Sequence, residues 1–311
     1  MLVRALEGAE AHPYGAARMI AQIFTVISPV IFISLLGYIW ERRRMPFDTA
    51  AMSYISSYIG GPCLMMSTLL KSDIDLGIAA RIVAAPILLI TVMGLLGWAI
   101  SHALKLPAKI YAPVLMFPNS GNMGVALCLF AFGEDGLAYA VTYFATMAGL
   151  QFSVGVSIAS GKFSMKGLYT NPVLISIVLS GVLMALHVRL PQWTMNVMGL
   201  LGGLMIPLML LSLGTALAKL RVASVGRNLG FSLVRLVGGF VVGFGIATLL
   251  GLEGAARGSV IIQSAMPIAV FTYMFAEQFG NAPEEVAAMV FISTILSFTS
   301  RPFLIGFALS L

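Results

Sequence analysis

The stretch Met116-Phe-Pro-Asn-Ser-Gly-Asn-Met-Gly124 lies in the middle of apolar sequence and interrupts it with a proline, two glycines and three polar side chains. Pro118 has no backbone N–H, and its ring clashes with the preceding helical turn, so we expect a helix to break here. Asn119, Ser120 and Asn122 then lie where backbone groups lose their helical partners. The stretch therefore predicts a broken helix with polar groups at the break.

A second stretch of the same form, Gln263-Ser-Ala-Met-Pro267, lies in the second half of the chain. Matched breaks in two halves of a membrane chain indicate a binding site, because unwound backbone exposes N–H groups and half-helix dipoles that suit an anion. The alternative is a proline kink whose amides satisfy freed carbonyls. The predicted substrate-binding residues are Pro118, Asn119, Ser120, Asn122, Gln263, Met266 and Pro267.

Composition supports a membrane setting for both stretches. Of 311 residues, 59% are hydrophobic and only 10% are charged, against about 25% charged in soluble domains. The net charge of +6 comes from basic residues in short clusters between apolar runs, so we expect no nucleic-acid partner. Cys63 and Cys128 lie inside apolar segments as packing residues. No metal site and no cofactor is predicted.

Hydropathy predicts an all-α polytopic membrane protein with ten transmembrane helices. The expected spans are 19–40, 50–70, 80–104, 111–131, 137–160, 172–190, 196–218, 229–250, 256–278 and 284–309. Residues 1–18 form a polar N-terminal segment without the apolar run of a signal peptide. The longest polar break, Gly161–Thr170, divides the chain near its midpoint into 19–165 and 166–311.

The two halves resemble each other in register. Four pairs of positions match at offsets of 143, 145, 149 and 147: Ser28 with Asn171, Pro62 with Pro207, Pro118 with Pro267, and Phe144 with Phe291. Because each half holds five spans, an odd number, the second copy must run upside down in the membrane. Inverted repeats of this kind are the architecture of secondary carriers.

Loop charges predict the orientation. The face after spans 1, 3, 5, 7 and 9 carries ten Lys and Arg residues, and the opposite face carries seven, among them Arg301. The positive-inside rule then places both termini outside the cytoplasmic (inner) membrane.

The sequence Pro118-Asn-Ser-Gly-Asn-Met-Gly124, the paired breaks and the five-plus-five layout resemble the auxin efflux carrier family. That family includes plant auxin exporters and bacterial carriers of malate or malonate. Val125-Ala126 stand where family members often have Leu-Pro, which leaves the substrate open.

The resemblance implies a fold similar to that of bile-acid sodium symporters, with broken spans 4 and 9 crossing at the bilayer midplane. Spans 1, 2, 6 and 7 would form a scaffold and a dimer surface, and spans 3–5 and 8–10 a moving transport domain of the elevator type. It also implies that Pro118 and Pro267 are the crossover prolines and that Asn119 faces the substrate. We expect the Asn119 amide to donate to a substrate carboxylate; the alternative is that it caps the broken helix.

Other polar side chains lie within the predicted spans. Thr142, Thr146 and Gln151 lie along span 5, and Ser293, Thr294 and Ser297 lie along span 10. Hydroxyls of this kind commonly bind carbonyls of their own helix, and the alternative is a pocket or cation site formed by Thr142, Thr146, Gln151, Ser293 and Ser297. Arg235 lies seven residues into span 8, and we expect it to snorkel to the interface; the alternative is that it faces an aqueous cavity and attracts anions.

These features predict a secondary transporter of a small organic anion, a mono- or dicarboxylate. No acidic residue lies at the centre of a span, no GxxxxGK[ST] motif is present, and no His or acidic cluster suggests an enzyme. The alternatives left open are a sodium-coupled organic-anion symporter, an ion channel and a membrane sensor. The expected partners are the anion, the lipid bilayer and a second copy of the chain, packed through spans 2 and 7, where Gly199, Gly202 and Gly203 permit close approach.

Overall fold

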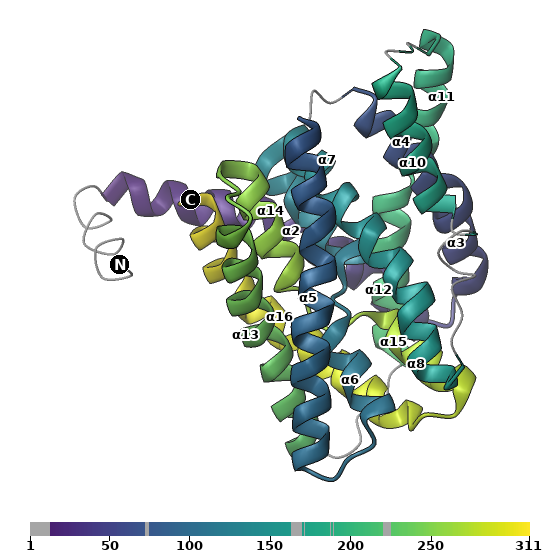
Figure 1. The fold of residues 1–311 in the computed structure, drawn as a ribbon, viewed down its shortest axis with the longest axis vertical. Coiled ribbons are helices and arrows are strands. Elements are labelled where there is room, and N and C mark those ends of the chain that lie inside the picture. The colour runs from purple at the N-terminus through teal and green to yellow at the C-terminus, as the bar shows by residue number, and fades with distance from the viewer. Residues whose placement is uncertain are drawn as a thin grey trace.

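The computed structural model describes residues 13–71, 75–162, 170, 172–186, 188, 190–219 and 225–311. Within these ranges the regular structure is helical, and the helices pack into one elongated body (Figure 1). The first half contains α2 Pro13–Arg42, α3 Thr49–Ile55, η1 Ser56–Gly60, α4 Gly61–Leu69, α5 Leu76–Ala103, α6 Ala108–Met116, η2 Ser120–Gly124, α7 Val125–Leu150, η3 Gln151–Gly155 and α8 Val156–Ser160. The second half contains α10 Pro172–Ala185, α11 Gln192–Gly203, α12 Met205–Lys219, α13 Val225–Leu249, α14 Gly254–Ser264, α15 Val270–Phe279 and α16 Pro283–Leu309.

Several helix limits differ from the predicted ones. α2 begins at Pro13, six positions before the expected span and inside the segment predicted to be polar and N-terminal. Proline suits the first turn of a helix, where its missing N–H has no partner to lose. Residues 1–12 lie outside the described part of the chain.

The predicted loop between spans 4 and 5 is a sharp kink. The helical run continues from η2 through α8 and is interrupted at Gly133, whose φ of 65° and ψ of −148° are non-helical. Glycine adopts positive φ without a Cβ clash, so the chain reverses there within a single residue. The polar residues Glu134 and Asp135 follow the kink and are exposed.

Five helical runs within the described residues are long and apolar enough to cross a membrane. They are Gly77–Ala103, Ser120–Ser160, Gln192–Thr215, Gly226–Leu249 and Pro283–Leu309, and Pro172–Met184 is a shorter apolar helix. The other predicted spans are built from shorter pieces, as in α6 and η2 or in α14 and α15. The total of ten crossings stays a prediction.

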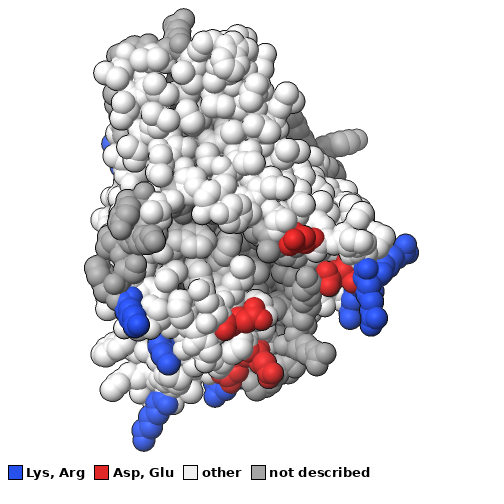
Figure 2. Space-filling model, turned by 90° about the vertical axis from the view of Figure 1, so that its right-hand side faces the viewer, with Lys and Arg blue, Asp and Glu red and all other residues white. Residues whose placement is uncertain are grey.

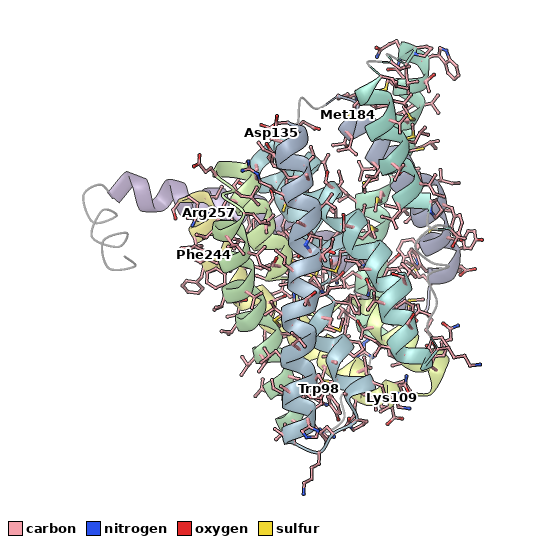
Figure 3. The ribbon with its side chains drawn as sticks, in the orientation of Figure 1. Trp98, Lys109, Asp135, Met184, Phe244 and Arg257 are labelled. Atoms are coloured by element: carbon pink, nitrogen blue, oxygen red, sulfur yellow. The ribbon has the colours of Figure 1, made fainter. Side chains whose placement is uncertain are left out.

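The outer surface and the two ends of the molecule agree with a membrane setting. Figure 2 shows charged side chains gathered on the lower part of one face, with uncharged residues above them. Many large apolar side chains point outward, including Leu200, Leu249 and Phe303. In Figure 3, Lys109 lies near one end of the molecule and Asp135 near the other. The chain between them, which contains the first break, therefore passes from end to end.

Helix packing falls into two groups. In one group α2 packs on α12, and α4 packs on α10 and α11. In the other group α5 packs on α6 and α7, while α13 packs on α14 and α16, and α14 also packs on α7. The groups touch where α7 meets α2, α4 and α10, where η2 meets α12, and where α16 meets α2.

Candidate functional site

The first predicted break is present at Pro118. α6 ends at Met116, and the backbone becomes extended at Phe117, with φ −104° and ψ 105°. Helical structure resumes only at Ser120, as the wide-turn helix η2. Proline supplies no N–H and disfavours helical geometry in the residue before it, which explains why the helix stops at Met116.

The second predicted break is present at Pro267. α14 ends at Ser264, and α15 begins at Val270 after an extended residue, Ala269, with φ −65° and ψ 135°. Five residues, 265–269, thus leave the helical conformation in the interior of the fold, and all five are buried. Their backbone groups need partners from elsewhere in the chain.

The two breaks supply those partners to each other. Pro118 and Ile268 form an isolated antiparallel β-bridge. The Asn119 N–H donates to the Pro267 carbonyl at 2.7 Å, and the Ala269 N–H donates to the Phe117 carbonyl at 3.0 Å. The extended segments of the two broken helices therefore cross in direct backbone contact, a feature that we call the crossover (residues 117–119 and 265–269).

Arg235 of α13 binds backbone carbonyls of both broken helices next to the crossover. It is fully buried, and its guanidinium donates to the Leu115 carbonyl at 3.0 Å, to the Ser264 carbonyl at 2.5 Å and to the Met266 carbonyl at 3.3 Å. These carbonyls lie at the C-terminal ends of α6 and α14, where helix dipoles present negative charge and carbonyls lack intrahelical partners. One cation thus satisfies both half-helix ends.

This finding corrects the expectation for Arg235. The residue neither snorkels to the interface nor faces an aqueous cavity, because it is fully buried and its guanidinium donates to three carbonyls that the breaks leave free. Close approach of α13 makes this geometry possible: a Cβ at Gly239 would lie 2.4 Å from the Ser264 oxygen. The partners lie 29 to 120 positions away in sequence.

The predicted polar residues after Pro118 have separate environments. Asn119 and Ser120 are buried, and Asn122 is half-buried. The Asn119 carbonyl accepts from the Gly124 N–H at 3.3 Å, while its side-chain amide nitrogen is buried without a hydrogen-bond partner. Asn119 makes no side-chain cap of η2, and its predicted role toward a substrate stays a prediction.

Gln263 connects the end of α14 to α7. Its Nε2 donates to the Ala140 carbonyl at 3.1 Å, and its Oε1 is buried without a partner. A Cβ at Gly124 would lie 2.0 Å from that oxygen, so any larger residue at position 124 would force the Gln263 side chain to move. Met266 and Pro267 are buried, and both offer their carbonyls to the crossover contacts already described.

The hydroxyls of the two long helices divide into two kinds. Thr142 and Thr146 bind carbonyls of their own helix, those of Ala138 and Thr142, which is the structural alternative. Ser293 also accepts from the Ile268 N–H at 3.2 Å, so it supports the crossover directly. Gln151 is buried with its Nε2 unpartnered. The pocket or cation site formed by these residues stays a prediction.

Arg301 is the residue that sequence reasoning misplaced. The charge count places it in a loop on the outer face, but it lies inside α16 and is fully buried. Its Nη2 donates to Ser297 Oγ at 2.8 Å and approaches the Met123 sulfur of η2 at 3.4 Å, while Nε and Nη1 have no partner. A charge within an apolar span is a functional candidate by default, so position 301 itself carried the signal.

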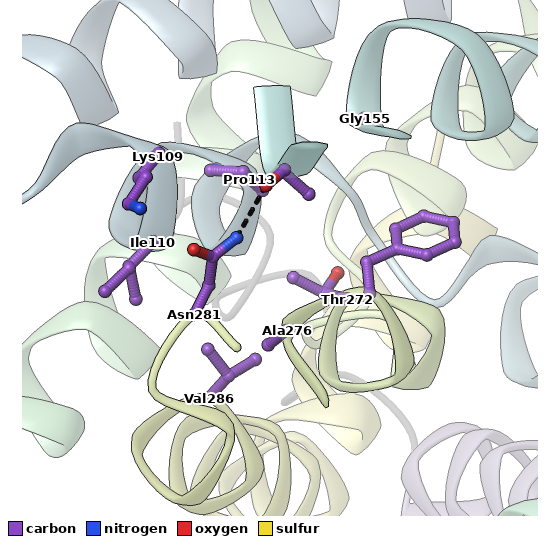
Figure 4. A pocket seen from close by; sticks show the side chains of 10 residues that line it. Lys109, Ile110, Pro113, Gly155, Thr272, Ala276, Asn281 and Val286 are labelled. Atoms are coloured by element: carbon purple, nitrogen blue, oxygen red, sulfur yellow. Dashed lines mark hydrogen bonds between the residues drawn. The ribbon is translucent and has the colours of Figure 1, made fainter. Parts of the chain in front are cut away.

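A small pocket lies between α6, α15 and the segment that precedes α16 (Figure 4). Its wall includes Pro113 of α6, Thr272 of α15 and Asn281, whose side chain donates to the Ala159 carbonyl at 2.7 Å. None of the predicted site residues lines it. Within the described residues, no group of three or more His, Cys, Asp or Glu side chains could hold a metal ion.

Together these features define a helical membrane protein whose two broken helices cross and exchange backbone hydrogen bonds in its interior. Residues 22–158 and 154–305 match the family model described as membrane transport protein. The chain belongs to this auxin efflux carrier-like family, which confirms the resemblance, and it is an integral multi-pass membrane protein of a transporter family.

Two curated relatives are similar to the chain. An uncharacterized transporter of Methanocaldococcus jannaschii is 28% identical over 195 residues, which span 59% of this chain and 63% of that protein. An uncharacterized transporter of Methanothermobacter thermautotrophicus is 27% identical over 293 residues, which span 89% of this chain and 95% of that protein.

Proposed function

We propose that this protein is a secondary transporter that carries a small organic anion, a mono- or dicarboxylate, through the crossover by an elevator-type movement. The observation that carries the proposal is the backbone contact between the two broken helices at Pro118 and Ile268. Irregular backbone inside a membrane protein is tolerated where it is buried in protein or lines a binding cavity. In secondary carriers, such breaks hold the substrate.

We propose an anion as the substrate because buried hydrogen-bond donors near the crossover have no acceptor among the described residues. The Asn119 amide nitrogen is buried without a partner beside the crossover, and Arg301 reaches the adjoining η2. Within the described residues, no carboxylate pairs with Arg301 or hydrogen-bonds to Asn119. Donors without acceptors favour a ligand that carries oxygen acceptors and negative charge.

Helix packing supports two inverted repeats of five spans, in 19–165 and 166–311. Contacts occur in pairs that such a repeat would relate: α2 with α12 and α10 with α4, α5 with α6 and α13 with α14. The same packing supports a scaffold of spans 1, 2, 6 and 7 and a transport domain of spans 3–5 and 8–10. The crossover lies in the second group, where an elevator needs its substrate site.

Orientation and assembly complete the proposal. Removing the buried Arg301 from the outer face leaves six Lys and Arg residues there, seven minus one, against ten on the inner face. This strengthens the orientation with both termini outside the cytoplasmic membrane. For a homodimer through spans 2 and 7, Gly202 is occupied within the chain by the Leu64 backbone, whereas Gly199 and Gly203 have open space beside them.

Transport is tested by reconstituting the purified protein in liposomes and measuring uptake of labelled mono- and dicarboxylates. We expect saturable uptake of at least one carboxylate. Its absence for every carboxylate, together with single-channel currents, would instead indicate an ion channel. Ligand binding without uptake would indicate a sensor. Chemical crosslinking in native membranes tests the homodimer, and recovery of monomer alone would contradict it.

A sodium-coupled organic-anion symporter is the second candidate. The observation that favours it is the Gln263 side-chain oxygen, which is buried beside Gly124 without a donor and is therefore available to a cation. Comparing uptake in sodium and in choline buffer separates the two candidates. Uptake that requires sodium would favour the symporter, and equal rates would favour transport without sodium.

A further inference from the structure

Arg301 carries a charge that no carboxylate among the described residues balances. It is fully buried in α16, and the ion pair within the described residues joins Arg227 to Glu285, elsewhere in the fold. Its guanidinium stacks on the Phe298 ring with a carbon-to-centroid distance of 4.1 Å, a contact that compensates only part of the lost hydration. A buried charge without a counter-ion destabilises the protein that holds it, so its presence requires a gain elsewhere.

Only one of the three guanidinium nitrogens of Arg301 makes hydrogen bonds within the described part of the chain. Nη2 binds Ser297 Oγ and contacts the Met123 sulfur, a weak acceptor. Nε and Nη1 are buried and have no partner. Arg235 provides an internal standard, since the same side chain, equally buried, uses all three of its nitrogens on carbonyls. The fold can therefore satisfy a buried guanidinium, and at Arg301 it does not.

The position of Arg301 links it to the crossover. Met123 lies in η2, four residues after Asn119, whose amide nitrogen is likewise buried without a partner. η2 packs on α12, and α16 packs on α2. The helix that follows Asn119 and the helix that contains Arg301 therefore each contact a helix of the proposed scaffold.

We propose that Arg301 is an anion-binding residue that receives a carboxylate of the transported substrate. The guanidinium supplies the fixed positive charge and two nitrogens without partners in the described ranges, Nε and Nη1, and the Asn119 amide supplies a further neutral donor at the crossover. Arg–carboxylate bonds are the strong, charge-assisted kind, which suits a group that must compete with water for an anion. This inference rests on the proposed function and assigns its substrate class to one side chain.

The test uses the full-length protein in detergent and compares wild type with Arg301→Gln and Arg301→Lys. Thermal unfolding is recorded without ligand and with a panel of mono- and dicarboxylates, with chloride as the inorganic anion. Arg81→Gln is the matched control, because Arg81 is exposed and donates to the Leu250 and Gly251 carbonyls just after the C-terminal end of α13.

We expect carboxylates to stabilise the wild type and Arg81→Gln equally, because binding to the folded state raises its stability. Arg301→Gln should weaken carboxylate binding about 10- to 100-fold, and Arg301→Lys should weaken it less because it keeps the charge. Without ligand, Arg301→Gln should unfold at the same temperature as wild type or higher, since it removes an unbalanced charge. If Arg301 only stabilised the fold, Arg301→Gln would lower the unfolding temperature and leave carboxylate binding unchanged.

Three outcomes would overturn the inference. The first is carboxylate binding by Arg301→Gln as tight as that of wild type. The second is a wild type that no carboxylate stabilises while chloride does, which would make the site one for a resident inorganic anion. The third is a wild type stabilised by no anion, with Arg301→Gln strongly destabilised. Failure of the transport function is distinguished from these by uptake in liposomes, which would be absent in wild type and variants alike.

Discussion

Arg235 and Arg301 are both fully buried arginines within apolar helices, but they differ in how many of their hydrogen-bond donors have acceptors. Arg235 gives its donors to three carbonyls at the ends of the broken helices. Arg301 leaves two of its three nitrogens without any acceptor. The comparison teaches that burial alone does not reveal the role of a membrane charge. A buried polar side chain whose donors all have acceptors stabilises the fold, and one near the crossover whose donors lack acceptors is a candidate for ligand binding.

The same division extends to neutral groups at the crossover. Ser293 and the Nε2 of Gln263 bind backbone groups of other helices and belong with Arg235. The Asn119 amide nitrogen has no partner and belongs with Arg301. Substitutions of the side chains grouped with Arg235 should lower the free energy of unfolding. Substitutions of those grouped with Arg301 should lower the affinity for a carboxylate. The experiments below separate the two effects.

The largest effect is expected for Arg235→Met, which keeps much of the side-chain volume but removes every donor. Three buried carbonyls would lose their partner, so the free energy of unfolding should fall by about 3–5 kcal/mol. Thermal unfolding in detergent measures it, with Arg301→Gln as the comparison. Equal stability of Arg235→Met and wild type would show that the crossover does not depend on this cation.

Asn119→Ala should act on affinity instead. Losing a donor to a carboxylate costs about 1.5–3 kcal/mol, or roughly 10- to 100-fold in Kd. Stability should change little, because the amide nitrogen has no partner among the described residues. Titration calorimetry and thermal unfolding on one preparation measure both. Asn196→Ala is the control, since Asn196 is exposed and accepts only from Gln192. Unchanged affinity with lowered stability would move Asn119 to the structural class.

Gly124→Ala tests how closely the two broken helices must approach. The new methyl group would lie 2.0 Å from Gln263 Oε1, and Gln263 is held on its other side by the Ala140 carbonyl. Overpacking of this kind costs about 1–3 kcal/mol. Gly181→Ala in α10 is the matched control, because nothing lies within 4 Å of its added Cβ. It should be neutral or slightly stabilising. Similar unfolding temperatures for both variants would contradict the close fit.

The smallest effect is expected for Ser293→Ala. The Ile268 N–H would lose its acceptor in the crossover, which should lower stability by about 1 kcal/mol. Thr91→Val serves as the control, because Thr91 binds only the Ile87 carbonyl of its own helix. We expect that variant to change the unfolding temperature less. If the two variants behave alike, the Ser293 bond contributes nothing specific to the crossover.

The sequence by itself determined the features whose causes are local. Pro118 and Pro267 break their helices because proline lacks an N–H wherever it stands, and apolar runs between short basic clusters require a membrane in any fold. Asn119 could be assigned to the break because it directly follows Pro118. The kink at Gly133, in contrast, lay within a stretch whose polar residues indicated only a loop.

Only the tertiary structure decided which groups meet. The pairing of Pro118 with Ile268 and the contact of Arg235 with Leu115 join residues far apart in the chain, and no local pattern fixes such a pairing. Arg235 and Arg301 are the same residue type in similar apolar surroundings, so sequence reasoning could not separate them. Their difference depends on which carbonyls the folded helices bring within hydrogen-bond distance, and that is a property of packing in three dimensions.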